Sequence, residues 1–158
     1  MDLFDDSFVE FWNQLNKHKV KYILVGGFAT NLHGYQRYTG DMDIYIEDTL
    51  ENRKKIREAY KVYSKIDFEG FERIQFVPGW IDFPLNNGVR LDIMTSMVGI
   101  ELTFDECLKS AKLSQVGEVR VPVLHLNHLI ANKKAVARPK DKLDVFYLEK
   151  IKKLREES

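Results

Sequence analysis

The sequence lacks the features that mark several common protein classes. Its 158 residues include a single cysteine, Cys107, which excludes an internal disulfide and suits a reducing compartment. No apolar run approaches the roughly 18 residues of a membrane span, and the acidic start MDLFDDSF does not resemble a secretion signal. A Walker-type phosphate loop, GxGxxG, HExxH, paired CxxC and GxSxG are all missing. The sequence therefore favours a cytoplasmic protein outside the ATPase, dehydrogenase, metalloprotease, zinc-ribbon and serine-hydrolase classes.

The chain also lacks net charge, although its charges are unevenly spread. Residues 1–50 carry four Lys and Arg against eight Asp and Glu, whereas residues 131–158 carry nine against five. One interpretation is two solvated faces of opposite sign. The other is an acidic, metal-binding half that faces a basic half gripping phosphates. Overall neutrality argues against indiscriminate nucleic-acid binding.

Hydrophobic periodicity and capping residues predict alternating helices and strands in the first part of the chain. The predicted elements are a helix burying Phe8, Phe11, Trp12 and Leu15, a strand over Val20–Val25, a short helix over Phe28–His33, a strand over 41–47, and a helix to Tyr63 opened by a capping box of Asp48 and Glu51.

The remainder predicts strands first and helices last. The predicted elements are strands over Phe71–Val77 and Trp80–Phe83 broken by Pro78-Gly79, a turn at 86–88 into a strand over Val89–Met94, a helix over Phe104–Lys112, a hairpin over Leu113–Val123, and helices over Asn127–Val136 and Pro139–Arg155. Residues 1–158 are thus predicted to form one α/β or α+β domain, with a mixed sheet covered by helices and a helical C-terminus.

Gly26 and Gly27 lie between a buried strand and a helix. Glycine allows the backbone to approach a ligand closely, and the free N–H groups at a helix start attract phosphate. A Gly-Gly pair more often simply ends a strand, so this feature alone carries little weight.

Asp41 and Asp43 begin the next predicted strand. Strand side chains alternate, so both carboxylates point to one side while Met42 points to the other. Two carboxylates on one face repel each other unless a cation lies between them, and Mg²⁺ typically binds one or two carboxylates together with substrate phosphates. The bland alternative is a solvated strand end.

Asp92 interrupts the apolar strand Arg90-Leu91-Asp92-Ile93-Met94. A carboxylate in such surroundings needs a partner, which is either a metal or Arg90. Asp82 is a competing third carboxylate. Asp92 is preferred because its strand follows a tight turn and can lie against the strand that holds Asp41 and Asp43.

Two segments resemble the nucleotidyltransferase superfamily in its minimal, single-domain bacterial form, closest to the branch of AbiEii-type toxins. VGGFATNLHGYQRYTGDMDI carries its signature through Gly26, Gly27, His33, Gly34, Arg37, Thr39, Asp41 and Asp43. LIANKKAVARPKDKLDVFYL resembles the C-terminal motif of the same branch through Lys133, Arg138, Lys140, Asp141 and Asp144.

The resemblance implies a nucleotidyltransferase fold and Mg²⁺-dependent transfer of a nucleoside monophosphate from an NTP, with release of pyrophosphate. It also implies that two Mg²⁺ ions, or Mn²⁺ in their place, are held by Asp41, Asp43 and Asp92, with Asp92 activating the attacking hydroxyl. The implied nucleotide or acceptor contacts are Gly26, Gly27, Arg37, Thr39, Lys133, Arg138 and Lys140.

Alternatives remain for individual residues and for the function. His33 is expected to cap or pack, and Arg37 to neutralise Asp41 or Asp43 if it does not bind nucleotide. The acceptor hydroxyl belongs to tRNA, to a protein or to a small molecule such as an antibiotic. A toxin–antitoxin component that mainly binds a partner protein is the alternative to an enzyme.

Overall fold

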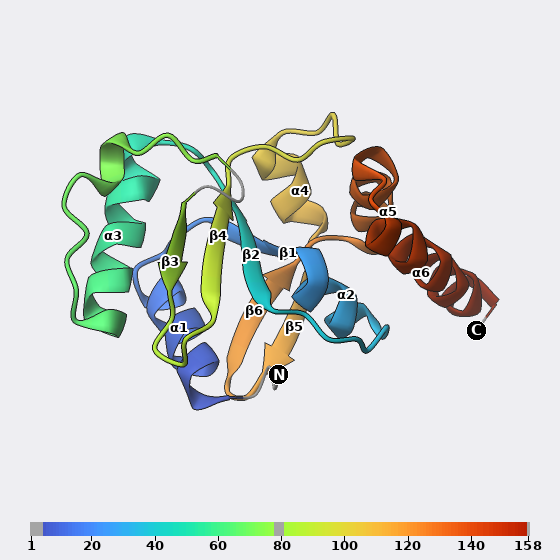
Figure 1. Cartoon of the computed structure of the whole chain (residues 1–158), viewed down its shortest axis with the longest axis horizontal. Helices are drawn as coiled ribbons and strands as arrows, with labels where there is room; N and C mark the ends of the chain where they lie inside the picture. The colour runs from blue at the N-terminus through green and yellow to red at the C-terminus, as the bar shows by residue number, and fades with distance from the viewer. Residues whose placement is uncertain (1–4, 78–80, 158) are drawn as a thin grey trace.

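The computed structural model describes residues 5–77 and 81–157. The first part of the chain folds into α1 (Asp6–Lys17), β1 (Tyr22–Val25), α2 (Gly26–His33), β2 (Asp41–Ile46), α3 (Leu50–Ser64) and the 3₁₀ helix η1 (Phe71–Arg73). The rest folds into β3 (Asp82–Pro84), β4 (Arg90–Met94), α4 (Phe104–Ser110), β5 (Lys112–Val116), β6 (Val119–Val123), α5 (Leu126–Val136) and α6 (Pro139–Glu157). The predicted α/β class with a helical C-terminus is confirmed (Figure 1).

The strands form one mixed sheet in the order β3-β4-β2-β1-β6-β5. The neighbours β2 and β4 are parallel, as are β1 and β6, whereas the other neighbouring strands are antiparallel. Helices α1 and α3 pack against each other. Helices α5 and α6 form a helical pair that contacts α2 and lies at one end of the molecule (Figure 1). No helix in the described part of the chain combines the length and apolarity needed to cross a bilayer.

The amphipathic prediction for the first helix is confirmed. Phe8, Phe11, Trp12 and Leu15 are buried in the core, and the Asp5 carboxylate caps α1 by accepting a hydrogen bond from the backbone N–H of Ser7. Cys107 is also fully buried in the core. The hairpin and both C-terminal helices lie within two residues of their predicted bounds.

The predicted strand over Phe71–Val77 is wrong. The segment forms η1 and then a loop, in which Phe71 and Phe76 pack against Phe83 at ring-centroid distances of 5.4 and 6.3 Å. Arg53 stacks on Phe76 and donates a hydrogen bond of 2.6 Å to the backbone carbonyl of Ile74. The Ile74 carbonyl therefore accepts a hydrogen bond from Arg53 where a strand would accept one from its neighbour. The aromatic side chains of the segment pack against Phe83 instead of lying on a sheet.

Two smaller predictions about element starts also differ from the structure. The capping box of Asp48 and Glu51 is wrong, because Thr49 caps α3 and Asp48 forms an ion pair with Arg53. The strand predicted over Trp80–Phe83 is observed as β3 over Asp82–Pro84, whereas Trp80 and the Pro78-Gly79 break lie outside the described residues.

Candidate active site

The glycine pair forms the first turn of α2, two residues earlier than predicted. Gly26 has a φ of +71°, and a side chain at this position would overlap the Asp43 carboxylate. A side chain at Gly27 would collide with Thr39. Glycine is therefore required at both positions, because α2 begins directly beside β2 and the loop that precedes it.

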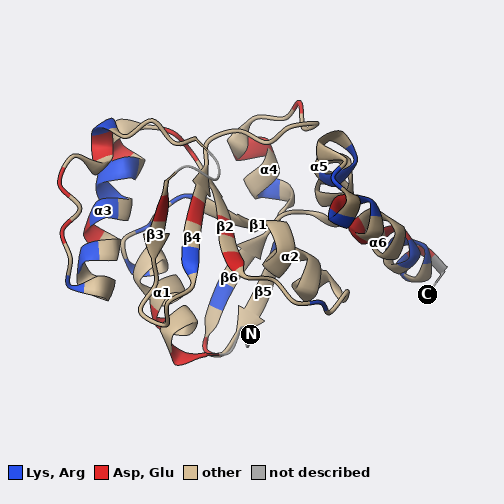
Figure 2. Cartoon of the chain, in the orientation of Figure 1, with Lys and Arg blue, Asp and Glu red and all other residues tan. Residues whose placement is uncertain are grey.

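The register of the sheet brings the predicted carboxylates together. Asp43 is the direct neighbour of Asp92 across the parallel strands β2 and β4, and Asp41 lies opposite Arg90. Residues in register on adjacent strands point to the same face, so the side chains of Asp41, Asp43 and Asp92 share one face of the sheet. Figure 2 shows acidic residues on both strands.

Asp82 lies one strand further out, on the edge strand β3. It is opposite Asp92 across the antiparallel pair of β3 and β4, and its carboxylate accepts a hydrogen bond of 2.5 Å from Arg90. The competing carboxylate therefore forms an exposed ion pair beside the cluster, and Arg90 is its partner.

Burial and like charge act together on Asp43. Desolvation, with the nearby charges of Asp92 and Asp41, raises the pKa of Asp43 to about 7, although Lys133 and Lys140 oppose the increase. A carboxyl group normally has a pKa near 4. The cluster thus has an unfavourable concentration of negative charge that a cation would relieve.

Two buried carboxylates of α6, Asp144 and Asp141, hold basic residues that other segments of the chain contribute. Arg37 donates two hydrogen bonds of 2.7 Å to Asp144, and Lys133 Nζ donates a third of 2.7 Å. Burial raises the pKa of Asp144, but the hydrogen bonds from Arg37 and Lys133 outweigh burial and leave the pKa below its ordinary value. Arg37 therefore neutralises Asp144, and the alternative that it neutralises Asp41 or Asp43 is wrong.

Asp141 organises the rest of this basic side. Its carboxylate accepts hydrogen bonds from the backbone N–H and the guanidinium of Arg138, and it lies 3.6 Å from Lys133 Nζ. Desolvation again raises the pKa of Asp141, while the bonds from Arg138 lower it below its ordinary value. Three cations, Arg37, Lys133 and Arg138, thus share two buried carboxylates, which leaves one positive charge in excess.

All the predicted site residues line one cleft of about 520 Å³. The acidic side, the glycine turn and the basic side contribute Asp41, Asp43, Asp92, Gly26, Gly27, Arg37, Thr39, Lys133, Arg138 and Lys140. We call this the acidic cleft. Carboxylates and basic groups thus line one cavity of the size that small-molecule ligands occupy.

Comparison with known proteins identifies the family. A family model described as nucleotidyl transferase of unknown function (DUF2204) matches residues 5–158. The chain belongs to this nucleotidyl transferase family. No curated protein matches it.

A solved structure agrees with this family assignment at the level of fold. The chain resembles the crystal structure of a "putative nucleotidyltransferase" from Thermotoga maritima with a TM-score of 0.56 and 17% sequence identity. The match covers 94% of this chain and 88% of that one. The nucleotidyltransferase fold and the superfamily resemblance are therefore confirmed.

The donor set of this nucleotidyl transferase fits a hard cation. Carboxylate oxygens are suitable Mg²⁺ ligands, and the crowded charge around Asp43 favours a cation there. Within residues 5–77 and 81–157, no group of three His, Cys, Asp or Glu side chains already forms a metal-binding arrangement. A bound ion would accordingly draw on substrate phosphates, or on a rotation of the more exposed Asp41, to complete its coordination.

Tyr38, Gly40 and Met94 also line the acidic cleft, although the sequence patterns did not single them out. Tyr38 belongs to the loop between α2 and β2, and 77% of its surface is exposed. The available signal was its place between Arg37 and Thr39. An exposed aromatic ring in the lining of such a cleft can stack on a planar group of a ligand.

Proposed function

We propose that this protein transfers a nucleoside monophosphate from an NTP to a hydroxyl acceptor, with Mg²⁺ held by Asp41, Asp43 and Asp92. The observation that carries the proposal is the register pair of Asp43 and Asp92, which lies in one cleft with the glycine turn and four basic residues. Phosphoryl transfer requires this combination of an acidic metal pocket and phosphate-binding donors.

The residues of the cleft suit distinct parts of the reaction. The backbone N–H groups of Gly26 and Gly27 face the triphosphate at the start of α2, where helix polarity favours an anion. Arg138 and Lys140 add positive charge to the lining of the cleft. Lys133 is 4% exposed and its Nζ is bound to Asp144, so its role is to set the local charge and position the basic side.

In the proposed step, the acceptor oxygen forms a bond to the α-phosphorus, the bond between that phosphorus and the bridging oxygen breaks, and pyrophosphate leaves. Asp92 takes the proton of the acceptor hydroxyl. The chemistry that bound Mg²⁺ supplies is a lower pKa for that hydroxyl and stabilisation of the charge on pyrophosphate. We propose the cytoplasm as the site of this reaction, since NTPs are available there.

A labelled-NTP assay tests the proposal. The protein is incubated with Mg²⁺, each NTP labelled at the α-phosphate, and a panel of tRNA, protein and small-molecule acceptors. Asp43→Asn should reduce transfer by roughly a thousandfold, because loss of a metal ligand costs about 4 kcal/mol of transition-state stabilisation. The matched control is Asp82→Asn, which removes a strand carboxylate outside the cleft and should retain activity.

Equal transfer by Asp43→Asn and the unchanged protein would reject the carboxylate site. Equal loss in Asp43→Asn and Asp82→Asn would show a general effect of charge instead of a specific site. The acceptor that becomes labelled separates the tRNA, protein and antibiotic alternatives.

A second candidate function is partner binding, as in a toxin–antitoxin pair. It is favoured by an exposed apolar stripe on α6, where Leu143, Phe146 and Leu154 are 51%, 52% and 66% exposed. Exposed apolar patches commonly mark protein contacts. A protein that co-purifies with the chain should be lost with Phe146→Ser and retained with Asp43→Asn, and the opposite result would reject this function.

A further inference from the structure

A second pocket of about 380 Å³ lies where the end of α2 meets the starts of β5 and α5 and the last turns of α6. We call it the basic pocket. None of its lining residues lines the acidic cleft. The eight residues of α2 separate the two, since the helix begins at Gly26 in the cleft and ends at His33 in the pocket. An α-helix of this length spans roughly 12 Å.

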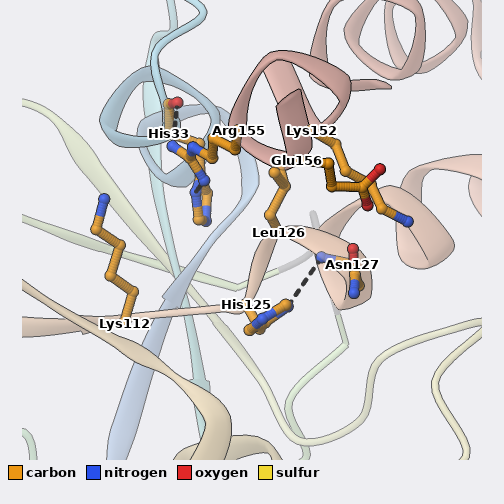
Figure 3. A pocket seen from close by; sticks show the side chains of 8 residues that line it. All are labelled: His33, Lys112, His125, Leu126, Asn127, Lys152, Arg155 and Glu156. Carbon is orange, nitrogen blue, oxygen red and sulfur yellow. Dashed lines mark hydrogen bonds between the residues drawn. The ribbon is translucent and has the colours of Figure 1, made fainter. Parts of the chain in front are cut away.

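Positive charge dominates the ionisable lining. Lys112, Lys152 and Arg155 contribute cations, and Glu156 is the one anion among the lining residues. Lys112 and Lys152 form no ion pair with any residue in the described part of the chain. Figure 3 shows Lys112 on one side of Arg155, with Lys152 and Glu156 on the other.

Hydrogen bonds fix Arg155 and His33 in the lining of the pocket. Arg155 donates a hydrogen bond of 2.7 Å to the backbone carbonyl of His33, and its other terminal nitrogen lies 3.4 Å from His33 Nδ1 (Figure 3). His33 Nε2 lies 2.7 Å from the carbonyl oxygen of Leu124, to which it donates. His33 thus packs as expected, and it holds the guanidinium in place.

The imidazole of His125, which also lines the pocket, provides an N–H donor. Its Nδ1 accepts a hydrogen bond from the backbone N–H of Asn127 at the start of α5, which places the proton of the neutral ring on Nε2. Burial lowers the pKa of His125, and the neighbouring His128, Arg155 and Lys152 lower it further. The pKa of His33 is lowered by burial and by Arg155 and Lys112 in the same way. Positive charge is therefore crowded around both rings.

We propose that the basic pocket binds the phosphate group of a small phosphorylated ligand, with Lys112, Lys152 and Arg155 supplying charge and His125 Nε2–H a hydrogen bond. A phosphate monoester carries a charge of about −1.5 to −2 at neutral pH and accepts strong bonds from Lys and Arg. The volume of the pocket lies at the lower end for small-molecule sites, which favours a compact ligand over a nucleic-acid strand.

Nuclear magnetic resonance of the four histidine side chains tests this proposal directly, with inorganic phosphate as the first probe. Phosphate should shift the His125 signals saturably and raise the pKa of that ring, because a bound anion favours the imidazolium. The double variant Lys112→Gln/Lys152→Gln should weaken phosphate binding at least roughly tenfold.

The matched control is Lys54→Gln/Lys61→Gln, which removes the same charge from exposed positions of α3 on another part of the molecule. It should change the apparent affinity by less than about twofold, since distant surface charges are screened by salt. Asp43→Asn should leave the His125 response intact, which separates the basic pocket from the acidic cleft and from the proposed transferase activity.

Two further probes identify the source of the phosphate. A nucleoside monophosphate should saturate the same His125 shift, and a short single-stranded RNA should compete more weakly. Failure of phosphate to shift His125, equal weakening by both double variants, or a response to RNA alone would each overturn the proposal.

Discussion

The carboxylate of Asp144 neutralises two of the cations that line the acidic cleft, Arg37 and Lys133. Replacing Asp144 with the neutral Asn is therefore the most informative single change. Asp144 is fully buried and accepts three hydrogen bonds of 2.7 Å from Arg37 and Lys133. In Asp144→Asn, one side-chain oxygen remains as an acceptor, but an NH₂ group faces a cation. Two partly or fully buried cations then lose their main counter-charge.

The contacts set the size of the expected loss. Breaking a buried ion pair by removing one partner typically costs about 3–5 kcal/mol. The cost should fall at the lower end, because the side chain of Arg37 is 21% exposed and can regain water, and Lys133 stays 3.6 Å from Asp141. A loss of about 3 kcal/mol corresponds to a fall of roughly 10 °C in Tm for a chain of this size.

Thermal and urea unfolding of Asp144→Asn at pH 7 measure this loss. The control is Glu51→Gln, which removes the same charge from an exposed helix pair with Lys55 and should cost less than about 0.5 kcal/mol. Because the folded-state pKa of Asp144 lies below its ordinary value, its stabilisation is fully present above the unfolded pKa of about 4. That stabilisation is lost as the pH falls towards the folded pKa, so the difference between Asp144→Asn and the unchanged protein should shrink in acid.

Two results would refute this reasoning. One is a destabilisation no larger than that of Glu51→Gln, which would mean that the buried cations find equal stabilisation elsewhere. The other is a difference in stability that stays constant from neutral pH to below pH about 4, which would mean that Asp144 does not act through its ionised carboxylate.

Three further predictions concern the acidic cleft. Mg²⁺ should raise the Tm of the unchanged protein and of Asp82→Asn but not of Asp43→Asn, because an ion that binds the folded state stabilises it. Equal shifts in Tm for all three proteins would place the Mg²⁺ site outside the acidic cleft. Gly26→Ala should lower transfer at least tenfold and destabilise the fold by about 1–3 kcal/mol, since the backbone at this position is left-handed and the new methyl group meets the Asp43 carboxylate. Unchanged transfer kinetics would contradict the predicted close approach of the Gly26 backbone to the substrate. Tyr38→Ala should raise the KM for NTP roughly tenfold while Tyr38→Phe keeps it, because stacking needs the ring and not the hydroxyl; equal KM values in both would exclude stacking.

Local sequence patterns determined much of this protein. The alternation in a strand places Asp41 and Asp43 on one face whatever surrounds them, and helical spacing requires Phe8, Phe11, Trp12 and Leu15 to be buried together. The close approach of the backbone at Gly26 and Gly27 could also be predicted from the sequence, because it requires residues without side chains. These features depend on neighbours within a few positions in the chain.

Elsewhere the same residues fitted more than one environment. The aromatic and β-branched run from Phe71 to Val77 suits a strand and equally suits an aromatic cluster. Its outcome depended on Phe83 and on Arg53, which takes the Ile74 carbonyl as a hydrogen-bond acceptor. A choice that depends on partners so distant in sequence cannot be made from periodicity.

Only the tertiary structure decided how the cleft is assembled. Strand register places Asp43 beside Asp92, and Asp82 forms an ion pair with Arg90. Arg37 binds Asp144, which lies 107 positions further along the sequence. Sequence alone determined which groups could bind metal and phosphate, because their chemistry belongs to the residues themselves. Which of those groups meet, and which are already neutralised by a buried partner, depends on long-range packing, and charge at a site is a property of that arrangement.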